Sequence, residues 1–143
     1  AGQAFHWFDQ ATTRKEFDRI LKPSGHMVLI WNARKDDMPF TGGYENILTS
    51  NIPEYKTLDH RNVNDAAIAA FFSPGKMKKR VIANSQVFDW EGFKGRVMSS
   101  SYVPTTGPIH EKIMKEIKDL FDQHQQNGCV VFHYDTQIYW SDL

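Results

Sequence analysis

An amphipathic segment between two short apolar segments opens the chain, and this pattern limits the fold more than any other feature of the sequence. The first apolar segment, Ala1–Trp7 (AGQAFHW), ends in aromatic residues. A run of Lys22-Pro23-Ser24-Gly25 ends the amphipathic segment, because proline cannot continue a helix and glycine tolerates the reversal. Met27–Trp31 (MVLIW) is then apolar without alternation, which is typical of a strand buried on both faces of a parallel sheet. The pattern predicts a strand–helix–strand unit at the start of an α/β fold.

The amphipathic segment predicts a helix, with Asp9 as its N-cap or with Thr13 and Glu16 as a capping box. Its apolar face has residues three and four positions apart: Phe17, Ile20 and Leu21. Further along the chain, patterns of the same kind predict helices around Tyr44–Leu48, after an N-cap at Asn64 or Asp65, and at Glu91–Met98. A longer helix is predicted from Pro108 to Gly128. Its apolar stripe consists of Ile109, Ile113, Ile117, Leu120 and Phe121. Strands are predicted at Val81–Trp90 and Cys129–Trp140, and these two strands fit an antiparallel edge of a mixed sheet.

The length and charge of the chain narrow its class. A chain of 143 residues is long enough for one domain with a core, so a single domain over residues 1–143 is expected. Its 17 basic and 17 acidic residues cancel, and a net charge of +0 predicts neither nucleic acid nor an anionic membrane as a partner. Cys129 is the only cysteine, which excludes an internal disulfide and suits the cytoplasm.

Several common motifs are missing from the sequence. No two of the nine glycines stand two positions apart, so the chain has no G-x-G-x-G or G-x-G-x-x-G loop to cradle a nucleotide. The six histidines show no metal-binding spacing, and no metal site is predicted.

Two stretches resemble the middle of a class I S-adenosylmethionine-dependent methyltransferase: QAFHWFD at residues 3–9, and the strand that ends in Trp31-Asn32. Ser101-Tyr102-Val103-Pro104 resembles a later segment of the same family, and the resemblance extends to Tyr139. It implies a partial Rossmann-like methyltransferase sheet, with parallel strands plus an antiparallel edge and flanking helices. It also implies that this chain corresponds to the carboxyl-terminal half of the domain, with the cofactor-holding half upstream of residue 1.

The resemblance also implies roles for residues near the strand ends, where ligands bind in open α/β sheets. Gln3, Ala4 and His6 would lie on the cofactor side, and His6 is the one candidate general base. The substrate wall would include Trp7, Trp31, Asn32 and Tyr102, with Arg96 and Ser101 as further candidates.

Each of these segments also has a structural interpretation. His6 could belong to a hydrophobic plug, and Trp31 could lie in the core while Asn32 starts a turn. The serines at 99–101 could hold a turn or cap the long helix.

Two functions follow as expectations. The first is the carboxyl-terminal portion of a methyltransferase that acts on a small molecule and uses S-adenosylmethionine as its family does, with neither cofactor binding nor activity expected of this chain alone. The second is a non-catalytic α/β module that binds a ligand or partner. In either case a homodimer is expected, because the resembling fold places further strands beside Ala1–Trp7 that this chain does not contain.

Overall fold

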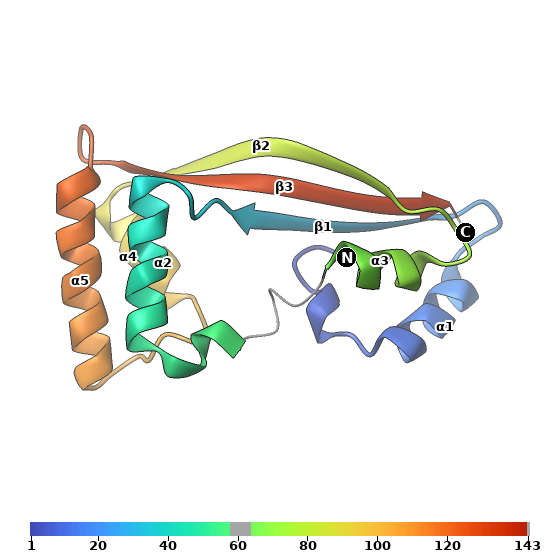
Figure 1. Ribbon diagram of the computed structural model, residues 1–143, viewed down its shortest axis with the longest axis horizontal. Coiled ribbons are helices and arrows are strands. Elements are labelled where there is room, and N and C mark those ends of the chain that lie inside the picture. Colours follow the sequence, from blue (N-terminus) through green and yellow to red (C-terminus); the bar gives the residue numbers. More distant parts are fainter. Residues whose placement is uncertain (58–63, 143) are drawn as a thin grey trace. The chain divides into compact units, whose positions relative to one another are not determined.

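The computed structural model describes residues 1–57 and 64–142 and contains both helices and a sheet (Figure 1). The strands are β1 (His26–Arg34), β2 (Lys78–Phe88) and β3 (Val130–Asp142). The helices are α1 (Gln10–Ile20), α2 (Pro39–Asn51), α3 (Asp65–Phe72), α4 (Trp90–Met98) and α5 (Pro108–His124), with short 3-10 helices η1 (Phe5–Trp7) and η2 (Pro53–Thr57). The α/β class is confirmed.

The sheet has the strand order β1-β3-β2, and β3 runs opposite to both of its neighbours (Figure 1). The predicted antiparallel strands are therefore present. The parallel part predicted from Ala1–Trp7 is reduced, among the described residues, to one isolated bridge between Gly2 and Ile30. The chain leaves β1 directly after Gln3, because Gln3 adopts a left-handed φ of 53° and η1 follows.

The prediction that Met27–Trp31 is buried on both faces is wrong for the described structure. Burial alternates along β1: Met27, Leu29 and Trp31 are buried, while Val28 and Ile30 are 38% and 40% exposed. Continuous apolar sequence does not by itself show that both faces are covered, and here packed side chains cover only one of them.

The chain divides into two compact units. The first contains the described residues within Ala1–Ala33, Leu58–Ala83 and Asp135–Leu143, and the second contains Arg34–Thr57 and Asn84–Tyr134. The single-domain expectation stays a prediction. Each unit has its own apolar core.

The core of the first unit joins the start of the chain to β1, α3 and β3. Its buried members are Phe5, Met27, Leu29, Trp31, Ile68, Phe71, Phe72 and Tyr139. The edge of the Phe5 ring meets Phe71, with 4.6 Å between centroids, and Phe17 of α1 packs on Phe71 at 6.0 Å. Ile20, predicted on the same face of that helix, is 52% exposed, because α1 ends there and the chain turns away.

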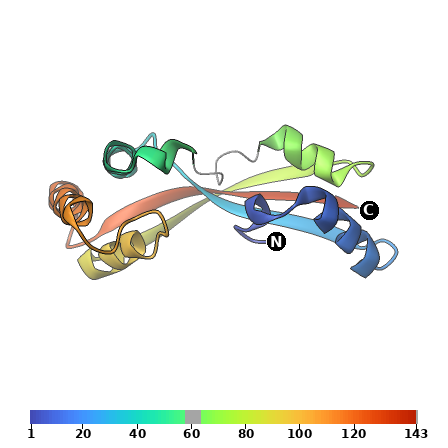
Figure 2. The same cartoon turned by 90° about the horizontal axis from the view of Figure 1, so that it is seen from below.

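The core of the second unit is largely aromatic. Phe132 of β3 contacts Phe40, Tyr44 and Phe93, with centroid separations of 5.4–5.7 Å. From α5, Ile113, Ile117 and Phe121 are buried as predicted, whereas Ile109 is 46% exposed in the first turn. Figure 2 views α2 and α5 nearly end-on, so the two packed helices have roughly aligned axes.

Helix ends follow the sequence signals closely. Asp9, Asn64 and Asp89 each accept a hydrogen bond from a backbone N–H in the first turn of their helix, at 2.8–2.9 Å. The long helix instead begins after Gly107, whose φ of 92° suits glycine, and Pro108 occupies its first turn.

Two helical glycines give a matched test of packing in the second unit. A Cβ on Gly42 of α2 would lie 2.7 Å from the backbone oxygen of Asp36, whereas a Cβ on Gly95 of α4 would meet nothing within 4 Å. We expect Gly95→Ala to raise the free energy of unfolding by up to about 1 kcal/mol through helix propensity. Gly42→Ala should lower it by about 1–3 kcal/mol, because a backbone atom cannot move aside cheaply. Urea denaturation of both variants measures the difference, and equal effects would contradict this packing.

Candidate functional site

The segment before η1 is held along β1 by hydrogen bonds that involve two of the predicted site residues. The backbone N–H of Gln3 donates to the carbonyl oxygen of Ile30 at 2.9 Å. The side-chain Oε1 of Gln3 accepts from the backbone N–H of Asn32, also at 2.9 Å. The hydroxyl of Thr136 on β3 then donates to Asn32 Oδ1 at 2.6 Å. Gln3 and Asn32 therefore lie together at the level where the chain leaves the sheet.

Asn32 does not start a turn. The predicted strand end at Trp31 is too early, because β1 continues to Arg34 and the N–H of Lys35 still donates to the carbonyl oxygen of His133 at 2.9 Å. Pairing with β3 keeps the backbone extended past Asn32, and its side-chain amide is left on the sheet surface, where it is exposed.

In η1, one aromatic ring is an anchor and the next residues are accessible. Phe5 is 1% exposed and packs against Trp31 at 6.0 Å, and Ala4, half-buried, precedes it as the helix N-cap. Trp7 is 76% exposed, and its ring lies 4.8 Å from that of half-buried His6. A buried anchor beside an exposed indole and an imidazole gives a surface that can meet a ligand.

Trp31 lies in the core rather than on this surface. It is 9% exposed and contacts Phe5 and Tyr139, edge to face, at 6.0 and 5.7 Å. In the structure its position matches the core alternative for this residue, and it touches the η1 segment through Phe5.

Tyr102 belongs to the second unit, where its ring meets that of Tyr55 at 5.0 Å. The serines before it hold the turn after α4. The Ser99 hydroxyl donates to the Arg96 carbonyl oxygen at 2.8 Å, and the Val103 N–H donates to the Ser100 carbonyl oxygen at 3.0 Å. They do not cap α5, whose N-cap is Gly107.

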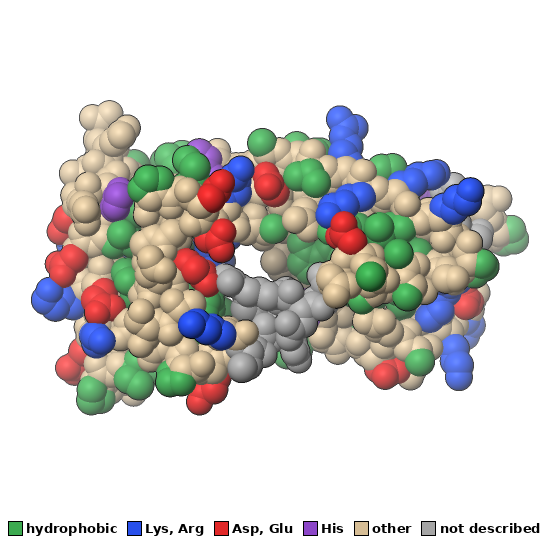
Figure 3. Space-filling view, viewed as in Figure 1, with side chains coloured by type: hydrophobic (Ala, Val, Ile, Leu, Met, Phe, Trp, Pro, Cys, Tyr) green, Lys and Arg blue, Asp and Glu red, His purple; other side chains and the backbone are tan. Residues whose placement is uncertain are grey.

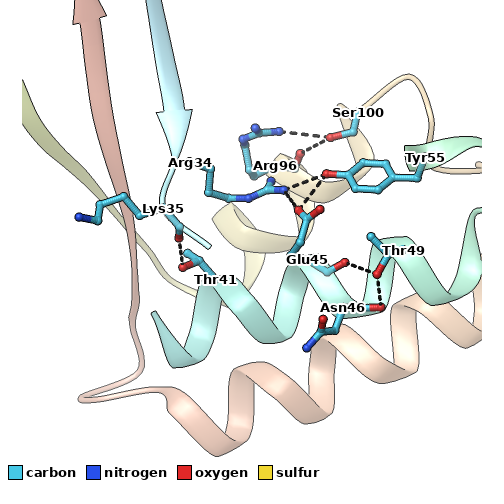
Figure 4. A network of polar contacts seen from close by, with 9 residues as sticks. All are labelled: Arg34, Lys35, Thr41, Glu45, Asn46, Thr49, Tyr55, Arg96 and Ser100. Carbon is cyan, nitrogen blue, oxygen red and sulfur yellow. Dashed lines mark hydrogen bonds and ion pairs between the residues drawn. The ribbon is translucent and has the colours of Figure 1, made fainter. Parts of the chain in front are cut away.

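Near Tyr102 the second unit contains a buried polar cluster that the sequence analysis did not assemble (Figure 4). Arg34, the last residue of β1, donates through Nη2 to Glu45 Oε2 of α2 and, at 2.9 Å, to the hydroxyl of Tyr55 in η2. The Tyr55 hydroxyl in turn donates to Glu45 Oε2 at 3.1 Å. The side chains of Arg34 and Glu45 are only 12% and 10% exposed, so both charges are largely removed from water.

Two further groups complete this cluster. The Arg34 guanidinium lies over the ring of Tyr44, 4.8 Å from its centroid. Arg96 of α4 donates to the Ser100 hydroxyl at 3.2 Å. Among the described residues, neither the buried Tyr44 hydroxyl nor the buried Nε of Arg34 has a hydrogen-bond partner.

Burial shapes the protonation of these groups. It raises the pKa of Tyr44 above its ordinary value, against the opposing pull of Arg34 and Arg96, and it also raises the pKa of Tyr55. Burial by itself lowers the pKa of Arg34, but interactions with Tyr55, Tyr44 and Glu45 more than offset this, so its pKa is raised. At neutral pH the cluster therefore contains a guanidinium cation and neutral phenols.

One signal in the sequence does point to this cluster. Glu45 follows Tyr44 and stands three residues before Leu48, the two apolar residues that define one face of the predicted helix, so a carboxylate lies beside that apolar face. A charge at such a position requires a buried partner. Nothing in the sequence identifies Arg34 as that partner, because the two residues meet only through the packing of α2 beside β1.

A surface depression in the first unit lies apart from the predicted site residues. A depression of about 240 Å³ in the first unit is lined by Gln10, Ala11, Arg14, Ala70 and Phe71, none of them a predicted site residue. Arg14 there donates to the carbonyl oxygens of Phe71 and Ser73, each at 2.7 Å, which is a structural role.

The described part of the chain lacks two further features, a metal-binding cluster and a membrane-spanning helix. Residues 1–57 and 64–142 contain no group of three His, Cys, Asp or Glu side chains placed to hold a metal. None of their helices has the length and hydropathy needed to cross a bilayer. On the face drawn in Figure 3, basic and acidic side chains are interspersed.

Comparison with known proteins gives a partial match to methyltransferases. No family model matches the chain. The uncharacterized methyltransferase C25B8.09 of Schizosaccharomyces pombe is 49% identical over 39 residues, which are 27% of this chain and 16% of that protein. The uncharacterized methyltransferase-like C25B8.10 of the same organism is 44% identical over 46 residues, 32% of this chain and 18% of that protein. The chain thus matches less than a fifth of the length of these curated relatives.

A solved structure, described as a "putative methyltransferase" from Bacillus halodurans C-125, aligns with 99% of this chain and 61% of its own. Its sequence identity is 16% and its TM-score 0.48. The matches to the two yeast proteins confirm the partial similarity to methyltransferases predicted from the sequence.

The buried pair gives a test of the cluster. We expect Arg34→Met to lower the free energy of unfolding by about 3–5 kcal/mol, because it leaves the Glu45 carboxylate buried without its cation. The double variant Arg34→Met/Glu45→Met should recover most of this loss, since no buried charge remains. As a control, Lys115→Ala removes the exposed partner of Asp119 and should cost less than about 0.5 kcal/mol. Denaturant titrations measure all three variants, and a loss in the double variant at least as large as in Arg34→Met would contradict the predicted pairing of the two charges.

Proposed function

We propose that this chain is the carboxyl-terminal portion of an S-adenosylmethionine-dependent methyltransferase that acts on a small molecule. The observation that carries the proposal is the 49% identity over 39 residues to a yeast methyltransferase. The exposed Trp7, half-buried His6 and the Gln3–Asn32 pair support it, because they form one accessible surface of the first unit.

The residues of this surface fit the methyl-bearing end of the cofactor. The exposed face of an indole attracts a cation such as a sulfonium, and Trp7 presents that face to solvent. Gln3 and Asn32 are tied to the backbone and to Thr136, so their remaining polar atoms have set positions. When bound, S-adenosylmethionine supplies an electrophilic methyl group for in-line displacement.

The proposed contribution of this chain is positioning. Holding two reactants in line supplies much of the rate of a displacement, and many methyl transfers need no base. Where the acceptor carries a proton, His6 is the candidate to take it. Trp31 supports the surface from below through Phe5, and Tyr102 remains a candidate for the substrate wall in the second unit.

A second candidate function is a non-catalytic module that binds a ligand or partner. The lack of any glycine pair spaced two apart favours it for this stretch of sequence. The gene sequence upstream of Ala1 distinguishes the two: an open frame with a glycine-rich strand-to-helix loop supports the enzyme, and a start codon directly before Ala1 supports the module.

Cofactor binding tests whether the cofactor site is divided between this chain and a segment upstream of it. We expect the 143-residue chain to give no saturable heat with micromolar S-adenosylmethionine in titration calorimetry, because contact with one end of the cofactor does not offset the ordering costs of binding. A chain extended upstream through the glycine-rich loop should bind it, and Trp7→Ala should weaken methyl transfer by about tenfold, the value of one lost cation–π contact. Val87→Ala, exposed on β2, is the matched control. Low-micromolar binding by the 143-residue chain at one site would overturn this division.

Self-association is a further proposal for the isolated chain. Val28 and Ile30 leave an apolar strip on the open face of β1, which a second copy would cover. Sedimentation velocity at micromolar concentration should detect a dimer, and Ile30→Lys should shift it to monomer. Ile109→Lys, with a comparable 46% exposure on α5, should leave it dimeric. A clean monomer for the unchanged chain would refute the proposal.

A further inference from the structure

The cluster at the end of β1 contains two buried hydrogen-bond donors that lack an acceptor. Tyr44 is fully buried, and its hydroxyl has no partner among the described residues. The Nε of Arg34 is also buried without a hydrogen-bond partner, and the guanidinium that contains it lies over the Tyr44 ring. Buried polar groups are nearly always satisfied, so two unsatisfied donors in one cluster call for a missing partner.

The chemistry of the donors defines that partner. A guanidinium has N–H donors and no acceptor, so whatever meets Arg34 Nε must carry a lone pair. The phenol of Tyr44 can donate to the same group. Nη2, which shares an edge of the guanidinium with Nε, already donates to Glu45 and Tyr55. The Nε–H is therefore left as a single donor for an oxygen ligand.

Charge indicates which kind of oxygen ligand fits. Arg34 and Arg96 contribute two guanidinium groups, and Glu45 is the carboxylate bound to Arg34. Arg96 donates to the neutral hydroxyl of Ser100, and both guanidinium groups are close enough to act on the pKa of Tyr44. Among the described residues the cluster thus carries one positive charge in excess, which one carboxylate group would neutralise and a doubly charged phosphate group would exceed.

We propose that Arg34, Tyr44 and Arg96 form a binding site for the carboxylate group of a small molecule. One carboxylate oxygen accepts from Arg34 Nε and from the Tyr44 hydroxyl. Arg96, which is half-buried at the margin of the cluster, supplies the balancing charge and the side from which a ligand enters. Glu45 and Tyr55 hold Arg34 in place and do not contact the ligand. The site needs no S-adenosylmethionine, so its test does not depend on the methyl-transfer proposal.

The test uses the whole chain and succinate as the probe. We expect succinate to raise the melting temperature saturably and to move the Arg34 Nε–H resonance in a ¹⁵N–¹H NMR spectrum. Neutral succinamide should do neither, and inorganic phosphate should bind more weakly than succinate. Tyr44→Phe should weaken succinate binding about tenfold, the value of one hydrogen bond to a charged group. Arg96→Gln should weaken it as well, by removing the excess charge.

The controls separate loss of binding from loss of folding. Without succinate, Tyr44→Phe should melt no lower than the unchanged chain, because the hydroxyl it loses has no partner. Tyr134→Phe alters another buried tyrosine of the same unit, outside the cluster, and should bind succinate normally. No saturable response, an equal response in Tyr44→Phe, or a response to succinamide would overturn the proposal and assign the two donors to a buried water. Tighter binding of phosphate would overturn the carboxylate class.

Discussion

The buried ion pair between Arg34 and Glu45 is the interaction on which the second unit depends. Removing two charges from water is costly, and their attraction compensates only when the geometry is good and the remaining donors and acceptors are bonded. Here Tyr55 bonds to both members of the pair, which joins β1, α2 and η2 at one point. The aromatic core around Phe132 packs beside this point, so the polar contact and the apolar core hold the same helix.

In the first unit, the corresponding role belongs to an apolar residue. Phe5 is almost fully buried between Trp31 and Phe71, and it anchors the turn that carries His6 and Trp7. With that anchor in place, the neighbouring side chains remain accessible, and Gln3 ties the turn to β1. This division between a buried anchor and exposed neighbours is what makes the segment a candidate for ligand contact.

Much of the local structure could be predicted from residue patterns. Asp9 and Asn64 cap helices where expected, and Pro108 occupies the first turn of α5, because capping and proline geometry depend on near neighbours. The predictions that were wrong concern strand length and burial rather than helix ends. The extension of β1 past Trp31 and the open face of β1 both depend on residues far away in the sequence, whereas Ile20 is exposed because α1 ends there.

The sequence by itself determined the α/β character of the chain, the order of its α-helices and strands after Trp7, and the resemblance to methyltransferases that two yeast proteins bear out over a short stretch. These follow from periodicity, turn residues and local identity. Only the tertiary structure decided that Trp31 belongs to a core, that Gln3 and Asn32 bond to each other, and that Arg34 meets Glu45 and Tyr44. The physical reason is that burial and charge pairing are properties of neighbours in space, and a charged residue in a sequence does not reveal its partner.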